Sequence, residues 1–304
     1  MMKKMVIGCV LLFLVLALAA CGNGSSAEGG EIFDYGAQKN TDAKIMGQVV
    51  TMVIEDQTIH EVEMTEDLPA SPQVMSAIDQ EELDFATLYS GEVYNNHFDE
   101  EQVEYSTDGE KTLEQAQELF GAEYDMKWYD SIGFRNQYSI AIKNDFAEEN
   151  NIETMSDLEP YASDLVLGTD NSWIERANDG YDAYQETYGY SFADANGMDV
   201  ALMYEGINSG ELDAVTAYTV DPQILEYDLQ VLEDDEQFFP PYDASIVARN
   251  DVVDAYPKVG EALDSIIGMI STEEMMELMH EVDINERSTE EVAKEFLQEK
   301  GLLE

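Results

Sequence analysis

The sequence predicts an α/β fold, in which short strands alternate with helices along most of the chain. Three observations support this prediction. Segments with strand character recur between segments with helical periodicity, which is typical of βαβ units and mainly parallel sheets. The chain has 304 residues, which corresponds to about two globular domains. Hydrophobic residues make up 44% of it, so it can bury a sizeable core, and a disordered or collagen-like chain is excluded.

The first half of the chain follows this alternation without an internal repeat. Its clearest helix has apolar residues at helical spacing on one face, at Ile45, Val49, Met52 and Val53. The expected elements are a strand at 31–37, a helix at 41–56, a strand at 60–64, a helix at 72–80, a strand at 84–88 and a helix at 112–124. Thr112 and Gln115 are placed to form a capping box at the start of the last of these.

The second half continues the pattern and ends in three helices. The expected strands are 139–142, 165–168, 214–217 and 245–248, with helical stretches at 154–158, 180–188 and 200–208 and a crossing segment at 229–232. The closing helices are expected at 252–270, 272–282 and 289–300, the last two starting in capping boxes, Ser271 with Glu274 and Ser288 with Glu291. In such folds ligands bind at the carboxyl ends of strands.

The N-terminus has the layout of a secretory signal. Lys3 and Lys4 precede an uncharged apolar run at 5–20, which is short for a membrane-spanning helix. The junction Leu18-Ala19-Ala20-Cys21 resembles the lipobox of bacterial lipoproteins, which implies cleavage before Cys21 and lipidation of that residue. The Gly/Ser-rich segment 21–30 would then be a flexible tether. The alternative is an uncleaved apolar anchor.

The charge and the cysteine content of the chain exclude several classes of function. The chain has 66 acidic and 14 basic residues, a formal net charge of −52, so it repels phosphate backbones and nucleic-acid binding is excluded. So many carboxylates also make any single pair of them uninformative. Cys9 leaves with the signal, so only Cys21 would remain, and we expect neither a disulfide nor a cysteine-based metal site.

The familiar catalytic motifs are absent from the sequence. There is no nucleophile elbow, no phosphate-binding loop and no His-Glu-x-x-His motif, and the one Gly-x-Gly lies in the tether. His60, His97 and His280 are scattered. The segment 194–205 is not a calcium loop, because its glycine is two positions early and Met198 occupies a ligand position. We therefore expect no catalytic residue, no cofactor and no metal.

Tyrosine is the conspicuous residue type. The chain has 17 tyrosines, and several lie at the ends of expected strands: Tyr89 after 84–88, Tyr138 before 139–142 and Tyr218 after 214–217. Tyr242 lies in the segment Phe238-Phe239-Pro240-Pro241-Tyr242-Asp243. Aromatic faces are electronegative, so several of them around one point hold a cation that cannot donate hydrogen bonds, such as a quaternary ammonium group. The alternative is that these are core or surface tyrosines.

A series of short motifs identifies a family resemblance over essentially all of the chain after the signal. The motifs are Gly36-Ala37-Gln38, Tyr89-Ser90-Gly91, Lys127-Trp128-Tyr129-Asp130-Ser131-Ile132-Gly133-Phe134, Asp170-Asn171-Ser172-Trp173, Asp213-Ala214-Val215-Thr216-Ala217-Tyr218, Phe239-Pro240-Pro241-Tyr242-Asp243, Glu281-Val282-Asp283 and Val292-Ala293-Lys294-Glu295-Phe296-Leu297. In this order and spacing the chain resembles the substrate-binding lipoproteins of osmoprotectant ABC importers, which take up choline, glycine betaine and carnitine.

The resemblance implies a two-lobed, type II periplasmic-binding-protein-like fold with the ligand in the cleft between the lobes. One lobe would comprise 31–130 and 234–304, the other 131–233, after a signal peptide at 1–20 and the tether at 21–30. The protein would be a monomer outside the cytoplasm, anchored to the cell membrane through Cys21. Its partners would be a quaternary amine and the permease subunits of the importer.

The resemblance also implies the site. Four tyrosines of the family cage the trimethylammonium group, and they match Tyr89, Tyr138, Tyr218 and Tyr242. Gln38 matches a glutamine that contacts the polar end of the ligand, and Asn136 is a further candidate contact. Glu92 departs from the family, in which many members carry a small hydroxyl residue and some an aspartate.

Glu92 favours choline among the possible ligands. If it points into the pocket, it accepts a hydrogen bond from the choline hydroxyl and repels the carboxylate of glycine betaine or carnitine. It could instead swing out to solvent, or accept a betaine when protonated. Two alternative functions stay open: a binder of another betaine, such as a histidine-derived one, and a surface-anchored hydrolase that uses two carboxylates.

Overall fold

The structure is a computed structural model that describes residues 29–94, 98, 102–171, 173–176 and 179–303. The expected signal peptide, Cys21, most of the tether and His97 lie outside the described residues. Residues from Glu31 onward form one compact unit. Within the described part, no helix is both long and apolar enough to cross a membrane.

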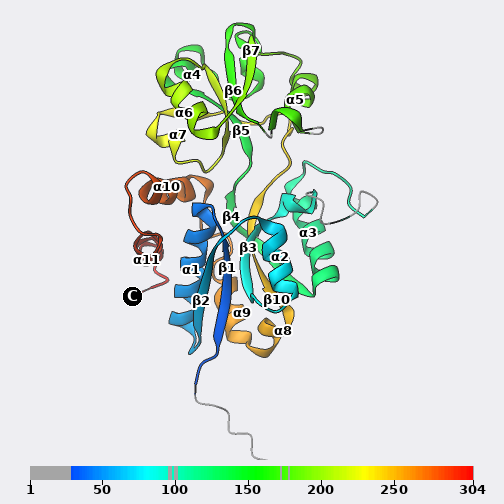
Figure 1. The fold of residues 1–304 in the computed structure, drawn as a ribbon, viewed down its shortest axis with the longest axis vertical. Coiled ribbons are helices and arrows are strands. Elements are labelled where there is room, and N and C mark those ends of the chain that lie inside the picture. The colour runs from blue at the N-terminus through cyan, green and yellow to red at the C-terminus, as the bar shows by residue number, and fades with distance from the viewer. Residues whose placement is uncertain (1–28, 95–97, 99–101, 172, 177–178, 304) are drawn as a thin grey trace, which may run out of the picture. The chain divides into compact units, whose positions relative to one another are not determined.

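The first lobe is built on a five-stranded sheet with the order β2-β1-β3-β10-β4 (Figure 1). Its strands are β1 (Ile32–Gln38), β2 (Glu61–Leu68), β3 (Phe85–Tyr89), β4 (Met126–Arg135) and β10 (Asp243–Arg249). β1 pairs in parallel with β2 and β3, whereas β10 is antiparallel to both of its neighbours. The sheet is therefore mixed, because the chain returns to β10 from the other lobe in the reverse direction.

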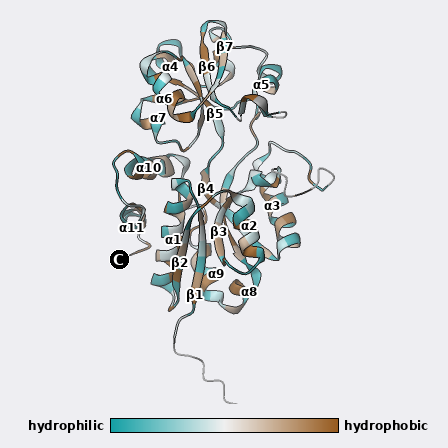
Figure 2. Cartoon of the chain, viewed as in Figure 1, coloured by the Kyte–Doolittle hydropathy of each residue, from teal (hydrophilic) through white to brown (hydrophobic). Residues whose placement is uncertain are grey.

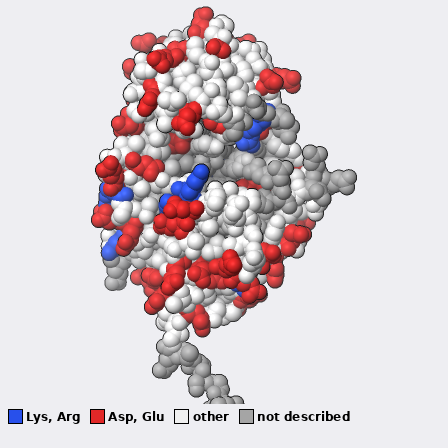
Figure 3. Space-filling model, viewed as in Figure 1, with Lys and Arg blue, Asp and Glu red and all other residues white. Residues whose placement is uncertain are grey.

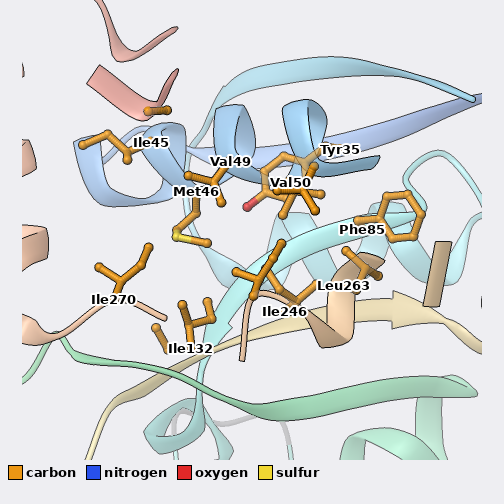
Figure 4. Close-up of a cluster of buried hydrophobic side chains, with 14 of the residues drawn as sticks. Tyr35, Ile45, Met46, Val49, Val50, Phe85, Ile132, Ile246, Leu263 and Ile270 are labelled. Atoms are coloured by element: carbon orange, nitrogen blue, oxygen red, sulfur yellow. The ribbon is translucent and has the colours of Figure 1, made fainter. Parts of the chain in front are cut away.

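Helices cover both faces of this sheet. On one face, α1 (Thr41–Gln57), α9 (Pro257–Asp264), α10 (Thr272–Asp283) and α11 (Thr289–Glu299) enclose the largest buried cluster. In Figure 4, Met46, Val49 and Val50 of α1 point toward Ile246 of β10. On the other face, α2 (Ser71–Asp79) and α3 (Gly109–Tyr124) cover β3, β10 and β4.

The second lobe has its own five-stranded sheet with the order β7-β6-β8-β5-β9. Its strands are β5 (Tyr138–Lys143), β6 (Val166–Asp170), β7 (Asp194–Met198), β8 (Ala214–Tyr218) and β9 (Leu229–Val231). One face packs on α4 (Asn144–Asn150) and α5 (Tyr181–Tyr188), and the other on α6 (Val200–Ser209) and α7 (Gln223–Glu226). Figure 2 shows hydrophobic residues on β6 of this sheet.

The chain passes between the two sheets twice, from β4 to β5 and from β9 to β10. β4 continues in the first sheet as far as Arg135, whose partner is Asp243 of β10. The first passage therefore begins five residues beyond the boundary expected at residue 130.

Several expected elements differ from the observed ones. The single helix expected at 252–270 is two helices, α8 (Asn250–Ala255) and α9, because Pro257 lacks an N–H and can only start a helix. α3 begins at Gly109 with Asp108 as its N-cap, so the capping box expected at Thr112 and Gln115 is wrong. Strands β4 and β7 and helix α4 were not expected.

Two helix starts agree with the sequence analysis. The capping box of Ser271 and Glu274 is confirmed by both of its hydrogen bonds. At α11, the Ser288 side chain accepts a hydrogen bond from the Glu291 backbone, which is the first half of the expected box. These polar starts precede apolar positions that face the core, which is why the periodic signal was readable there.

Candidate functional site

The four tyrosines lie at or next to strand ends, two in each lobe. Tyr89 is the last residue of β3, and Tyr242 comes directly before β10, whose Ala244 pairs with Tyr89. In the second lobe, Tyr138 starts β5, Tyr218 ends β8, and the two residues are direct partners in the ladder. Each lobe thus contributes a pair of tyrosines from neighbouring strands.

The tyrosines of the second lobe form a stack. The ring centroids of Tyr138 and Tyr218 are 4.5 Å apart with an interplanar angle of 30°, and the Tyr218 hydroxyl donates to the Tyr138 hydroxyl at 2.8 Å. Two rings this close leave no space for a trimethylammonium group between them. A cation can therefore meet this pair only from its outer side.

A cation already lies against this pair. The guanidinium carbon of Arg176 is 5.5 Å from the centroid of the Tyr138 ring, and the guanidinium also hydrogen-bonds Tyr242 of the other lobe. Arg176 is in turn held by Asp179, with Nε donating to Oδ1 at 2.9 Å. Burial alone would lower the pKa of Arg176, but Asp179 and Tyr242 raise it above its ordinary value. The face of the Tyr138 ring thus accommodates a positive charge.

The turn after β3 fixes Tyr242 beside Glu92. A Cβ on Gly91 would lie 2.7 Å from the Pro241 carbonyl oxygen and 2.9 Å from ring carbons of Tyr242, so only glycine fits. The Ser90 hydroxyl donates to the Pro241 carbonyl at 3.2 Å and accepts from the Asp243 backbone at 3.1 Å. These contacts lock the segment before β10 onto the turn.

Glu92 lies inside this turn and not in solvent. It is 5% exposed in the 3-10 helix Ser90–Tyr94. Burial raises the pKa of its carboxyl to about 7, although Ser71, the Tyr89 backbone and Gln38 stabilise the charged form. Gln38 is the last residue of β1, and Glu92 follows β3, which runs parallel to β1. Both residues therefore lie at the carboxyl end of these strands.

Polar atoms of three expected site residues remain buried without a hydrogen-bond partner. They are Gln38 Nε2, Glu92 Oε2 and Asn136 Oδ1. Such atoms cost free energy unless something satisfies them, and native proteins keep few of them. Two acceptors and one donor, placed at the end of β1 and after β3 and β4 of the first sheet, can bind the polar end of a small ligand.

Asp42 joins Tyr89 to Asn136 and was not found by sequence reasoning. Its Oδ2 accepts from the Tyr89 hydroxyl at 2.5 Å and from Asn136 Nδ2 at 2.7 Å. Burial and the Asp42 charge raise the pKa of Tyr89 well above its ordinary value. Asp42 follows Gln38 by four residues, but one carboxylate among 66 acidic residues gave no signal.

The structure thus brings Gln38, Tyr89, Glu92, Asn136 and Tyr242 together in the first lobe. Tyr138 and Tyr218 form the second group, and Arg176 connects it to Tyr242. Sequence reasoning missed Arg176 although it follows the motif at 170–173 by three residues. Within the described residues, no three His, Cys, Asp or Glu side chains come together in an arrangement that would hold a metal ion.

Comparisons with known proteins agree on one family. Residues 35–299 match the substrate binding domain of ABC-type glycine betaine transport systems. The carnitine transport binding protein of Listeria monocytogenes is 32% identical over 299 residues, covering 97% of this chain and 96% of that protein. The ergothioneine transport permease/ergothioneine binding protein of Helicobacter pylori is 28% identical, covering 96% of this chain and 52% of that protein.

Solved structures show the same fold. A crystal structure titled as a glycine betaine/carnitine/choline ABC transporter superposes with a TM-score of 0.84 and 29% identity, covering 90% of this chain and all of that chain. The expected two-lobed, type II periplasmic-binding-protein-like fold is confirmed.

Proposed function

The chain belongs to the family of substrate binding domains of ABC-type glycine betaine transport systems, and we propose that it captures choline in preference to glycine betaine and carnitine for delivery to a permease. Members of this family bind solutes for ABC importers and are not enzymes, so the hydrolase alternative is dropped. The finer claims, the tyrosine cage and the choline preference, rest on the site geometry.

Buried Glu92 is the observation that carries the choline preference. Its Oε2 has no hydrogen-bond partner and can accept from the choline hydroxyl. A betaine places a carboxylate there instead. Two like charges about 4 Å apart repel by roughly 1 kcal/mol in water and about 4 kcal/mol at an effective dielectric of 20. Since a difference of 1.4 kcal/mol corresponds to about tenfold in affinity, we expect choline to bind at least about tenfold more tightly than glycine betaine or carnitine.

The remaining charges of the site also favour a net cation over a zwitterion. Arg176 is paired with Asp179, so this pair offers no unneutralised positive charge to a betaine carboxylate. Asp42 and ionised Glu92 leave the first-lobe side of the cleft negative. Choline carries one positive charge, whereas glycine betaine carries none in total.

A betaine with a larger body is the second candidate ligand. The Helicobacter pylori relative is named for ergothioneine and the Listeria monocytogenes relative for carnitine, and both align along nearly the whole chain. The tyrosines would hold the ammonium group of either. Glu92 decides between these ligands and choline.

The proposal extends to the location of the protein. We propose that Cys21 is lipidated after signal cleavage and anchors a monomeric binding protein outside the cytoplasm, next to its permease. Several acyl chains at one residue give firm membrane attachment, whereas a single chain binds only marginally.

Titration calorimetry tests the ligand preference. Choline, glycine betaine and carnitine are titrated at pH 8 into the parent chain and into Glu92→Thr. We expect the parent to prefer choline at least about tenfold and the variant to lose most of that preference by gaining betaine affinity. Equal affinities for choline and betaine in the parent, unchanged in the variant, would refute the choline assignment and leave quaternary-amine binding intact.

A further inference from the structure

Asp42 is a buried carboxylate that has no basic partner among the residues the structure describes. Its side chain is 0% exposed, and none of the ion pairs in the described part of the chain includes it. Buried charges in proteins are normally paired with an opposite charge or bound to a metal. The negative charge of Asp42 is therefore left for something outside the chain to neutralise.

Hydrogen bonds hold Asp42 in place without cancelling its charge. Tyr89 and Asn136 donate to Oδ2, while the Ala43 backbone, at 2.9 Å, and the Asn40 side chain donate to Oδ1. All four contacts are donors, which is the arrangement that an ionised carboxylate takes. The first turn of α1 adds a favourable dipole but no net charge.

The field of this carboxylate extends over the junction of the lobes. Beyond the effect of burial, it raises the pKa of Tyr89 in β3, of Asp283 at the end of α10 and of Asp221 in the second lobe, whose pKa is about 6. Three neighbours on different elements thus feel an uncompensated negative charge beside the cleft.

We propose that Asp42 is the counter-charge of the ligand's quaternary ammonium group and acts on it through Tyr89. This inference rests on the proposed function. A phenol hydroxyl that donates to a carboxylate leaves more electron density on its ring, so the Tyr89 face attracts a cation more strongly. Asp42 does not touch the ligand, because both of its carboxylate oxygens are already occupied by the four donors named above. It is a positioning residue that sets the electrostatics of a cage residue.

The competing explanation is purely structural: Asp42 anchors the start of α1 and the passage at Asn136. That role would weaken every ligand by the same factor when Asp42 is changed. The electrostatic role weakens a cation more than an uncharged molecule of the same shape. Choline has such a counterpart in 3,3-dimethylbutan-1-ol, in which a carbon atom replaces the nitrogen.

The experiment measures both compounds by calorimetry, with the alcohol at millimolar concentration, on the full chain in detergent. We expect Asp42→Asn to weaken choline at least about tenfold and the alcohol less than threefold. The matched control is Asp283→Asn, a nearby carboxylate that accepts a hydrogen bond from the Thr41 hydroxyl at 2.7 Å. It should change both affinities by less than twofold.

A second variant covers the case in which Asp42→Asn does not fold. Tyr89→Phe keeps the aromatic ring and Asp42 but removes the hydroxyl that connects them. It should weaken choline at least threefold more than the alcohol. Equal loss for both compounds in either folded variant overturns the role of Asp42. A parent chain that binds neither choline nor another quaternary amine would instead overturn the proposed function.

Discussion

Glu92 is the residue on which the ligand preference depends, and its ionisation makes that preference depend on pH. Burial raises the pKa of its carboxyl to about 7, well above its usual value. Tyr89, whose pKa the charge of Glu92 helps to raise, stays protonated in this range, because its pKa lies well above its ordinary value. Glu92 is therefore the group at the turn that changes charge near neutral pH.

Choline affinity should rise, and glycine betaine affinity fall, as the pH increases through about 7. Choline favours the carboxylate, while a betaine favours the protonated acid, which can donate to the betaine carboxylate. A ligand whose binding lowers the pKa of Glu92 by about one unit binds about tenfold more tightly at a pH above the titration than at a pH below it. Calorimetry at pH 6 and pH 8 measures the change, and Glu92→Gln should flatten both profiles. Parallel profiles for the two ligands in the parent would contradict this role.

At the scale of elements, the turn after β3 connects the tyrosines of the first lobe to Glu92. Gly91→Ala should weaken choline at least about tenfold, because its Cβ would lie 2.9 Å from the Tyr242 ring and 2.7 Å from the Pro241 carbonyl oxygen. Gly260→Ala in α9 is the matched control. Its Cβ meets nothing closer than 3.8 Å, so it should stabilise the fold by about 0.5–1 kcal/mol with unchanged binding. Binding by Gly91→Ala at parental affinity would show that Tyr242 is not held by this turn.

Elements in which apolar residues recur at a regular spacing were predictable from the sequence. Elements that form only through tertiary contacts were not. α1 and α10 show apolar faces and, at Ser271, a polar start. β4 was missed because its buried and exposed residues do not alternate regularly, and β7 because its Asp-Ala-Asn-Gly stretch has loop composition. β7 is a strand only because it pairs with β6 at the edge of the sheet.

The same division holds for the site. The four tyrosines, Gln38, Glu92 and Asn136 could be named because they lie at strand ends or match a family motif. Asp42 and Arg176 acquire their contacts only when separate elements meet, so no local pattern marks them. Their roles follow from distances and burial and not from spacing.

At the scale of the whole molecule, several side-chain contacts connect the two lobes. Val220 of the second lobe belongs to the core of the first, and Met276 of α10 packs against the core of the second. His280 of α10 lies 3.4 Å from Glu226 of α7. Together with the passages between β4 and β5 and between β9 and β10, these contacts join the two lobes.

Surface charge suits a protein that attracts cations and avoids anionic partners. Figure 3 shows acidic side chains scattered over this face of the molecule and few basic ones among them. With a net charge of −52, long-range attraction of a cation depends on ionic strength. Binding to the buried groups of the site should depend on it much less.

Anchoring is separable from binding, because Cys21 precedes the compact unit that begins at Glu31. Cys21→Ala should release the protein from the membrane fraction, or mislocalise it, with its choline affinity unchanged. Fractionation followed by mass spectrometry checks both the location and the lipid. Finding the variant in the membrane fraction with a lipid-modified mass would contradict lipidation at Cys21.

The central claim is that the cleft recognises the positive charge of a quaternary ammonium group. Titration calorimetry of residues 31–304 with choline and with 3,3-dimethylbutan-1-ol tests it most directly, because the two molecules differ in charge and hardly in shape. Each aromatic face contributes about 0.5–2 kcal/mol of attraction to a desolvated cation, so choline should bind at least about a hundredfold more tightly. Equal affinities for the two compounds, or no binding of choline, glycine betaine or carnitine, would contradict the account.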